Sequence, residues 1–208
     1  MKHIIYLFII FFSVSYNTNA QSPIFPLDDW GNRQANAYYK DLNNDLDPFI
    51  GTWVYTPETQ SLNGETFIKI VLYKKTMHFD GEYYVDILAG EYQYVKNGVE
   101  QINTLANVDQ DLGEDHHIYG YFLSYDCRYF FVDDCVDGEV SVELGLEDLT
   151  GPIYSLKLHK RTNSFTGQEY LNAILWNGGG MITLAPGEVS TVPTLPYQLD
   201  NIKFMKQE

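Results

Sequence analysis

The stretch Leu46-Asp47-Pro48-Phe49-Ile50-Gly51-Thr52-Trp53 divides the chain into two parts with different patterns. After it, short runs of alternating apolar and polar residues follow one another to the C-terminus, with turn residues between them. A period of two is typical of antiparallel strands with one buried face and one wet face. Before it, Asp28–Asn43 is the one segment that we expect to be helical. The sequence therefore predicts an all-β domain with a short N-terminal helical arm.

The turn residues between the runs delimit the expected strands. Gly90 suggests a bulge, after which the alternation resumes, and Asn97-Gly98 is a strong signal for a two-residue hairpin. The ranges are Gly51–Thr56, Phe67–Lys75, Tyr83–Ala89, Val99–Leu105, Ile118–Tyr125, Arg128–Val132, Glu139–Leu146, Ile153–Lys160, Tyr170–Trp176, Ile182–Leu184 and Leu199–Lys206.

So many short strands can form either a sandwich or a sheet closed on itself, which removes its exposed edges. We expect one domain over residues 49–208, an antiparallel β-barrel of about 8–10 strands. Residues 21–48 form the arm that precedes it.

The charge of the chain excludes two classes of partner. The chain has 13 Lys and Arg against 28 Asp and Glu, a formal net charge of −15. Nucleic acids and anionic membranes are bound by Lys and Arg side chains that neutralise phosphate, so we expect neither partner. Twelve of the acidic residues lie between Asp109 and Asp148, where Arg128 is the one basic residue.

The first twenty residues have the pattern of a secretory signal peptide. Lys2 and His3 precede the apolar run Ile4–Val14, and Thr18 and Ala20 are small residues at the positions that signal peptidase requires. This pattern predicts cleavage after Ala20 and a secreted or periplasmic mature chain. No later segment reaches the roughly 18 apolar residues of a membrane span, so we expect no membrane insertion.

The chain has two cysteines, Cys127 and Cys135. Export to an oxidising compartment permits a disulfide between them. Metal-bound thiols are disfavoured because zinc sites use shorter Cys spacings with His partners. We expect a structural disulfide, with two buried free thiols as the alternative.

Gly51-Thr52-Trp53 resembles the Gly-x-Trp signature on the first strand of lipocalins and fatty-acid-binding proteins. The resemblance implies a lipocalin-like (calycin-type) barrel. In those families a short 3₁₀ turn closes one end, the glycine allows tight entry of the chain and the tryptophan plugs the floor. No second motif of the Thr-Asp-Tyr type is present, and Arg161 precedes a turn instead of packing on the tryptophan. Lys203 or Lys206 in the final strand is expected to replace that arginine by a cation–π contact.

Nearly the whole chain after residue 20 resembles a family of small exported proteins of unknown function from Bacteroidota. The shared features are the Ala20-Gln21 cleavage site, the segment Tyr39–Phe49 that leads into Gly51-Thr52-Trp53, and a closing Leu-Pro followed by Lys206-Gln207. This resemblance implies export and a barrel-like fold, and it carries no mechanism.

The sequence lacks the motifs of the common catalytic sites, such as G-x-S-x-G, H-E-x-x-H, a phosphate-binding glycine loop or a dinucleotide fingerprint. We therefore expect no catalytic residue, metal or cofactor. The carboxylate pair Glu147 and Asp148 is a weaker hypothesis, because neighbouring strand residues diverge. Two acidic segments, Asp41–Asp47 and Asp109–His117, space oxygen ligands as cation sites do, but a capped turn and a solvated loop are the preferred interpretations.

The tyrosine content, 17 residues, is the other outlier. Strand packing accounts for tyrosines in general, whereas aromatic side chains around a cavity or groove would hold an apolar ligand or a sugar. The leading hypothesis is a non-enzymatic, lipocalin-like protein that binds a small apolar or amphipathic ligand at the barrel mouth. The alternative is a structural or protein-interaction module that uses the acidic Asp109–Asp148 face and has a filled barrel. The candidate ligand-binding residues are Tyr83, Tyr92, Tyr94, Tyr119, Tyr121 and Trp176.

Overall fold

The computed structural model describes residues 22–29, 31, 33–57, 66–127, 137–177 and 193–207. This part of the chain is all-β, with three short 3₁₀ turns, η1 (Asp47–Phe49), η2 (Leu105–Asn107) and η3 (Gly113–Asp115). The strands are β1 (Ile24–Pro26), β2 (Tyr38–Lys40), β3 (Gly51–Tyr55), β4 (Phe67–Phe79), β5 (Tyr84–Lys96), β6 (Val99–Asn103), β7 (Ile118–Ser124), β8 (Ser141–Glu147), β9 (Ile153–Thr162), β10 (Glu169–Asn177) and β11 (Gln198–Gln207).

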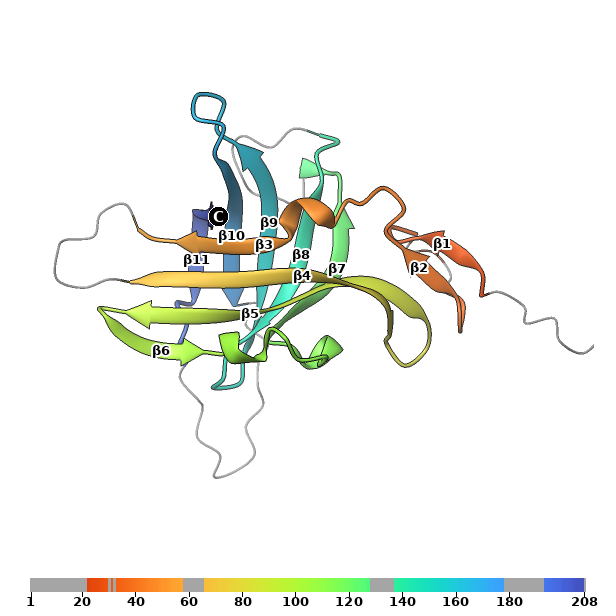
Figure 1. Cartoon of the computed structure of the whole chain (residues 1–208), viewed down its shortest axis with the longest axis horizontal. Coiled ribbons are helices and arrows are strands. Elements are labelled where there is room, and N and C mark those ends of the chain that lie inside the picture. Colours follow the sequence, from red (N-terminus) through yellow and green to blue (C-terminus); the bar gives the residue numbers. More distant parts are fainter. Residues whose placement is uncertain are drawn as a thin grey trace, which may run out of the picture.

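Eight of these strands form a closed antiparallel β-barrel, which confirms the predicted fold class (Figure 1). The barrel runs up and down in the order β3-β4-β5-β7-β8-β9-β10-β11, and β11 returns to pair with β3. The pairing between β5 and β7 that completes the ring is short, because it covers only Leu88–Gly90 of β5. Four predictions lie outside the described residues: the signal peptide, Cys135, and the strands Arg128–Val132 and Ile182–Leu184. In the described part of the chain, no helix is long and apolar enough to cross a membrane.

Strand β5 connects the barrel to everything outside it. One of its edges pairs with β4 along most of its length, and the other edge pairs in turn with β2, β7 and β6. The hairpin to β6 turns at Asn97 and Gly98, which both have positive φ, as the sequence predicts. The bulge expected at Gly90 is wrong, because the register with β4 continues through it. A Cβ at Gly90 would lie 2.1 Å from the Val71 carbonyl oxygen, so glycine allows the strands to approach closely.

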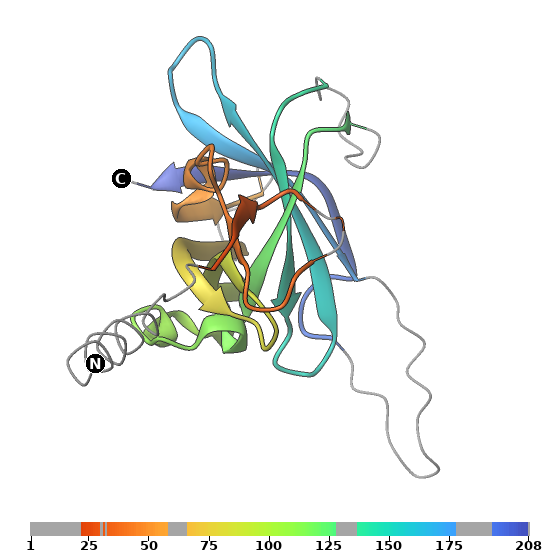
Figure 2. The ribbon, with the colours of Figure 1, turned by 90° about the vertical axis from the view of Figure 1, so that its right-hand side faces the viewer.

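The helical arm expected over Asp28–Asn43 is also wrong. Residues 38–40 form β2, which runs parallel to β1 and to the start of β5 on one side of the barrel (Figures 1 and 2). Asn36 has a φ of 62°, which ends any helical path before β2 begins. The Tyr38 hydroxyl donates to the Asp86 carboxylate at 2.6 Å, and the Tyr39 ring stacks on Phe25. Pairing with β5 and burial of both rings outweigh any local helix preference.

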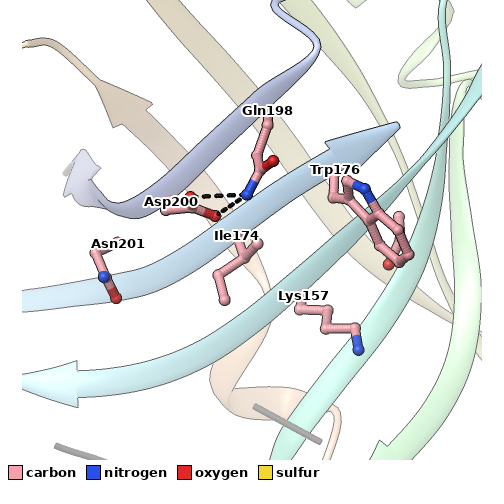
Figure 3. Close-up of a pocket in the computed structure, with 7 residues that line it drawn as sticks. Lys157, Ile174, Trp176, Gln198, Asp200 and Asn201 are labelled. Atoms are coloured by element: carbon pink, nitrogen blue, oxygen red, sulfur yellow. Dashed lines mark hydrogen bonds between the residues drawn. The ribbon is translucent and has the colours of Figure 1, made fainter. Parts of the chain in front are cut away.

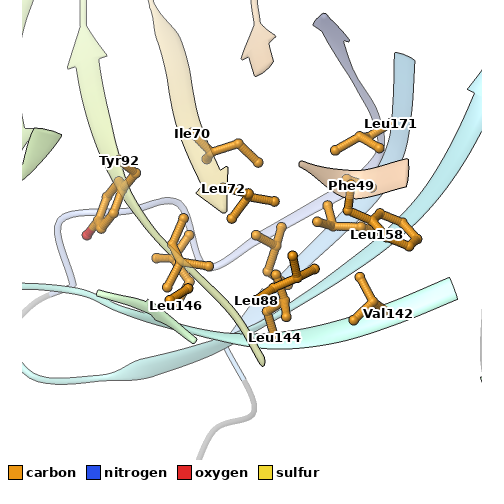
Figure 4. Packing of buried hydrophobic residues seen from close by; sticks show 14 of the residues in the cluster. Phe49, Ile70, Leu72, Leu88, Tyr92, Val142, Leu144, Leu146, Leu158 and Leu171 are labelled. Atoms are coloured by element: carbon orange, nitrogen blue, oxygen red, sulfur yellow. The ribbon is translucent and has the colours of Figure 1, made fainter. Parts of the chain in front are cut away.

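The inward-facing side chains of the barrel form one continuous core (Figure 4). Each of them is almost completely buried, so little space remains for water among them. They include Trp53 on β3, Ile70 and Leu72 on β4, Leu88 and Tyr92 on β5, Leu144 and Leu146 on β8, Leu156 and Leu158 on β9, Leu171 and Leu175 on β10, and Phe204 on β11.

Trp53 joins η1 to the first and last strands of the barrel. Its indole nitrogen donates to the Phe49 carbonyl oxygen at 2.8 Å, and its ring is fully buried. The Lys206 ammonium lies 5.4 Å from the centre of this ring, which confirms the expected cation–π contact, whereas Lys203 lies over Tyr170. Gly51 has a φ of 132°, a conformation that favours glycine at this entry point.

We predict that Trp53→Ala lowers the free energy of unfolding by about 3–5 kcal/mol, because it empties a fully packed site. Urea denaturation followed by circular dichroism measures this loss. Trp176→Ala, at a half-exposed position, serves as the control and should cost far less. Equal urea midpoints for Trp53→Ala and the unmodified chain would contradict the role of Trp53.

Candidate functional site

A pocket of about 380 Å³ lies on the outer face of the barrel, over β9, β10 and β11 (Figure 3). Its volume falls within the roughly 300–1,000 Å³ of small-molecule sites. Core residues such as Leu156 and Leu175 alternate along the strands with the residues of this face, so the pocket is separate from the barrel interior. The lining residues are Ser155, Lys157, Ile174, Trp176, Gln198, Asp200 and Asn201.

Strand register brings these side chains together. Ser155 on β9, Trp176 on β10 and Gln198 on β11 occupy one row across the three strands. In the next row Lys157 lies opposite Ile174. Cross-strand neighbours on one face lie within contact distance, so three segments far apart in the sequence build a single surface.

A bulge in β11 shapes one side of the pocket. Between the pairs Ala173–Ile202 and Leu175–Leu199, the two residues Asp200 and Asn201 face the single residue Ile174. Asn201 has a φ of 51°, in the left-handed region. Bulges of this kind redirect side chains, and here both extra residues line the pocket.

The pocket combines an apolar platform with a polar rim. Trp176 keeps 45% of its surface exposed, whereas Trp53, the other tryptophan of the described residues, is completely buried, and Ile174 beside Trp176 is 8% exposed. The Gln198 side-chain nitrogen donates to both oxygens of Asp200, at 2.9 and 2.8 Å. The Lys157 ammonium lies 3.4 Å from the Glu143 carboxylate. Trp176 was among the predicted ligand-binding residues, whereas Asp200 and Asn201 were missed because their place in the rim depends on the bulge.

The other predicted ligand-binding residues lie elsewhere. Tyr92 and Tyr94 are buried inside the barrel, and the Tyr92 hydroxyl donates to the Glu147 carbonyl oxygen at 2.8 Å. Burial raises the pKa of Tyr92, and the nearby carboxylate of Asp148 adds to this effect. These two tyrosines therefore contribute to the core in the described structure.

Tyr83, Tyr119 and Tyr121 gather around the N-terminal arm. The Arg33 guanidinium carbon lies 4.6, 4.7 and 5.2 Å from the ring centres of Tyr39, Tyr83 and Tyr121. The Tyr83 and Tyr121 hydroxyls lie 3.2 Å apart, and the Tyr119 ring meets Tyr121 edge-on. This aromatic cage attaches the arm to the barrel through cation–π contacts.

A buried polar cluster lies under the segment Asp109–His117, so the expectation of a solvated loop is wrong for His116. The two oxygens of Glu91 bind the Nδ1 atoms of His116 and His117, at 2.7 and 2.8 Å. The Tyr73 hydroxyl lies 2.6 Å from Nε2 of His116. Glu91 and the His116 side chain are completely buried, so they clamp the segment onto β5 and present no accessible chemistry.

The segment Asp41–Asp47 is a capped turn, as the sequence predicts. Asp41 accepts hydrogen bonds from the backbone nitrogens of Asp45 and Leu46, at 2.8 and 3.0 Å. The Lys74 ammonium lies 2.8 Å from the carboxylates of both Asp41 and Asp47. Burial opposes the charge of Lys74, but the two carboxylates raise its pKa. In the described structure, a lysine therefore supplies the positive charge beside these carboxylates.

Asp148 holds the segment that covers the other end of the barrel. One of its oxygens accepts hydrogen bonds from the backbone nitrogens of Thr194 and Leu195, both at 2.8 Å, and the other binds Thr150. Leu195 is buried, and its carbonyl oxygen accepts a hydrogen bond from the Tyr154 hydroxyl. Burial opposes ionisation of Asp148, but the backbone donors outweigh it and lower its pKa. This carboxylate acts as an anchor, which leaves the pair with Glu147 without support as a catalytic site.

Residues 1–176 match a protein family described as a family of unknown function (DUF6705). No curated protein and no solved structure shows significant similarity to the chain. The roles of the residues in the pocket therefore rest on their geometry.

We predict that Asp148→Asn destabilises the chain at pH 7 and that the difference from the unmodified chain shrinks as the pH falls below about 4. The pKa of Asp148 in the folded state lies below its ordinary value, so its stabilising effect is complete above that value and is lost on acidification through the folded pKa. Urea denaturation between pH 7 and pH 3 tests this. Glu147→Gln, at an exposed neighbouring position, is the matched control. A difference that stays constant over this range would contradict the anchoring role.

We predict that Arg33→Ala speeds hydrogen exchange of the β2 amides by about one order of magnitude, since partly buried cation–π contacts are worth about 1–2 kcal/mol. Hydrogen–deuterium exchange with mass spectrometry measures this change. Lys40→Ala removes an exposed charge from the same arm and should leave exchange unchanged. Equal protection in Arg33→Ala would show that the cage does not hold the arm.

Proposed function

We propose that this chain, which belongs to the DUF6705 family of unknown function, is an exported, non-enzymatic protein that binds a small amphipathic ligand in the Trp176 pocket. The observation that carries the proposal is the half-exposed Trp176 beside Ile174, within a pocket that polar side chains border. Such a combination of one apolar wall and a few fixed polar groups is typical of small-molecule sites.

The packing inside the barrel supports a site on the outer face. Trp53, Tyr92 and Leu158 fill the interior, and none of them is measurably exposed. Phe49 on η1 packs under one end of this core, and Leu195 is buried at the other end. Binding at the barrel mouth would require these side chains to move, whereas the outer pocket already has the volume that a ligand needs.

Export is a second part of the proposal, and the sequence of residues 1–20 supports it. A basic start, an apolar run and small residues before Gln21 favour cleavage after Ala20. Cys127 follows β7, and we propose that it pairs with Cys135 once the chain reaches an oxidising compartment.

The filled interior also fits the alternative of a protein-interaction module with an acidic face. Part of the charge on that face is, however, matched within the chain. Glu139 lies beside Arg161 and His159, and Glu143 accepts a hydrogen bond from Ser155 at 2.6 Å. Asp148 is buried in its anchor. These contacts leave less free acidic surface than the sequence suggests, so the pocket is the better candidate.

We predict saturable binding of at least one compound among lauric acid, haemin and dodecyl maltoside below its micelle concentration, measured by isothermal titration calorimetry. Trp176→Ala should weaken binding about tenfold, because an aromatic contact is worth about 0.5–1.5 kcal/mol beyond its burial. Phe165→Ala removes a fully exposed ring from the turn between β9 and β10 and should have no effect. Absence of binding of these compounds and of neutral oligosaccharides, or equal affinity in Trp176→Ala, would refute the proposal.

A further inference from the structure

We infer that the ligand of the Trp176 pocket is a neutral sugar whose ring stacks on the indole, an inference that rests on the proposed function. The three observations behind it are the shape of the platform, the mixture of polar groups and the charge of the rim.

The platform suits a flat ligand with one apolar face. Trp176 and Ile174 lie side by side on the open outer surface of β10, and Trp176 is half exposed (Figure 3). A pyranose ring presents carbon-bound hydrogens on one face, which pack on an aromatic ring, and hydroxyls around its edge. An alkyl chain gains most from a site that removes it from water on all sides, which an outer-face pocket does not provide.

The rim matches the hydrogen bonding of hydroxyl groups. A sugar hydroxyl both donates and accepts, so it needs donors and acceptors close together. Asp200 is an acceptor, Lys157 is a donor, and the amides of Gln198 and Asn201 are both. The bond between Gln198 and Asp200 already fixes this pair, which reduces the entropy that binding would cost.

The charge of the rim favours a neutral ligand. The pocket has one cation, Lys157, and one anion, Asp200. The Glu143 carboxylate lies 3.4 Å from the Lys157 ammonium and offsets the charge of this lysine. Glu143 belongs to β8, which pairs with the edge of β9 opposite to β10. The carboxylates of Asp200 and Glu143 would repel a phosphate or a carboxylate ligand. A neutral sugar would meet no such repulsion.

The bulge in β11 gives the site its specificity. It places Asp200 and Asn201 beside Ile174, at a left-handed backbone conformation that the regular sheet does not require. The remainder of β11 follows ordinary register with β10 and β3. The irregular step therefore occurs where it adds two hydrogen-bonding side chains to the platform.

The test is calorimetric titration of the full chain with maltotriose, cellotriose and N,N′-diacetylchitobiose, with lauric acid titrated in parallel. We expect saturable binding of at least one sugar, with an affinity that does not change between 50 and 500 mM salt, because salt screens interactions between charges and a neutral sugar carries none. Trp176→Ala and Asp200→Ala should each weaken it about tenfold, because the first removes the stacking platform and the second removes a charged hydrogen-bond acceptor. Gln198→Ala, which leaves the bulge residues in place, should weaken it too, and Phe165→Ala should not.

The outcomes separate the two proposals. Binding of lauric acid that Trp176→Ala abolishes, with no binding of any sugar, would overturn the sugar and leave the proposed function standing. Absence of all binding would overturn both. Sugar binding that persists at full strength in Trp176→Ala and Gln198→Ala would place the site elsewhere and would also overturn both, provided that circular dichroism shows each variant folded.

Discussion

Closure of the barrel between β5 and β7 is the constraint on which the rest of the structure depends. A barrel of eight strands is just wide enough for its own side chains to fill, and here Ile70, Tyr92 and Leu158 do so. Because β5 and β7 meet only over Leu88–Gly90, the remaining edge of β5 needs other partners, which β2 and β6 provide. The arm and the additional hairpin are thus consequences of an incomplete seam.

Two buried carboxylates hold the segments that cover the ends of this core. Asp41 caps the turn before η1 and binds Lys74, whereas Asp148 binds the backbone of Thr194 and Leu195. In both places the carboxylate satisfies backbone nitrogens that would otherwise be buried without partners. These two acidic residues therefore have a structural use, and a net charge alone is a poor guide to what the surface binds.

The sequence was a good guide to features that depend on local pattern. Period-two alternation and Asn97-Gly98 located most strands and a hairpin, and Trp53 marked the first barrel strand. The helical arm failed because Tyr38 and Tyr39 find their partners on β5, far away in the sequence. The contacts of Glu91 with His116 and His117 were missed for a similar reason, since adjacent histidines reach one carboxylate only when their segment folds over β5.

The pocket could be predicted only in part, and the missing part says most about its use. Trp176 is visible in the sequence as an aromatic residue on a strand, but its exposure follows from register, which places Leu175 inside. A single exposed apolar residue needs no explanation. An exposed tryptophan beside a two-residue bulge and a fixed pair of polar side chains, Gln198 and Asp200, is a different case. Register accounts for the exposure of Trp176, but packing of the barrel does not require the bulge or the fixed pair beside it, and this combination is the basis of the proposed small-molecule site.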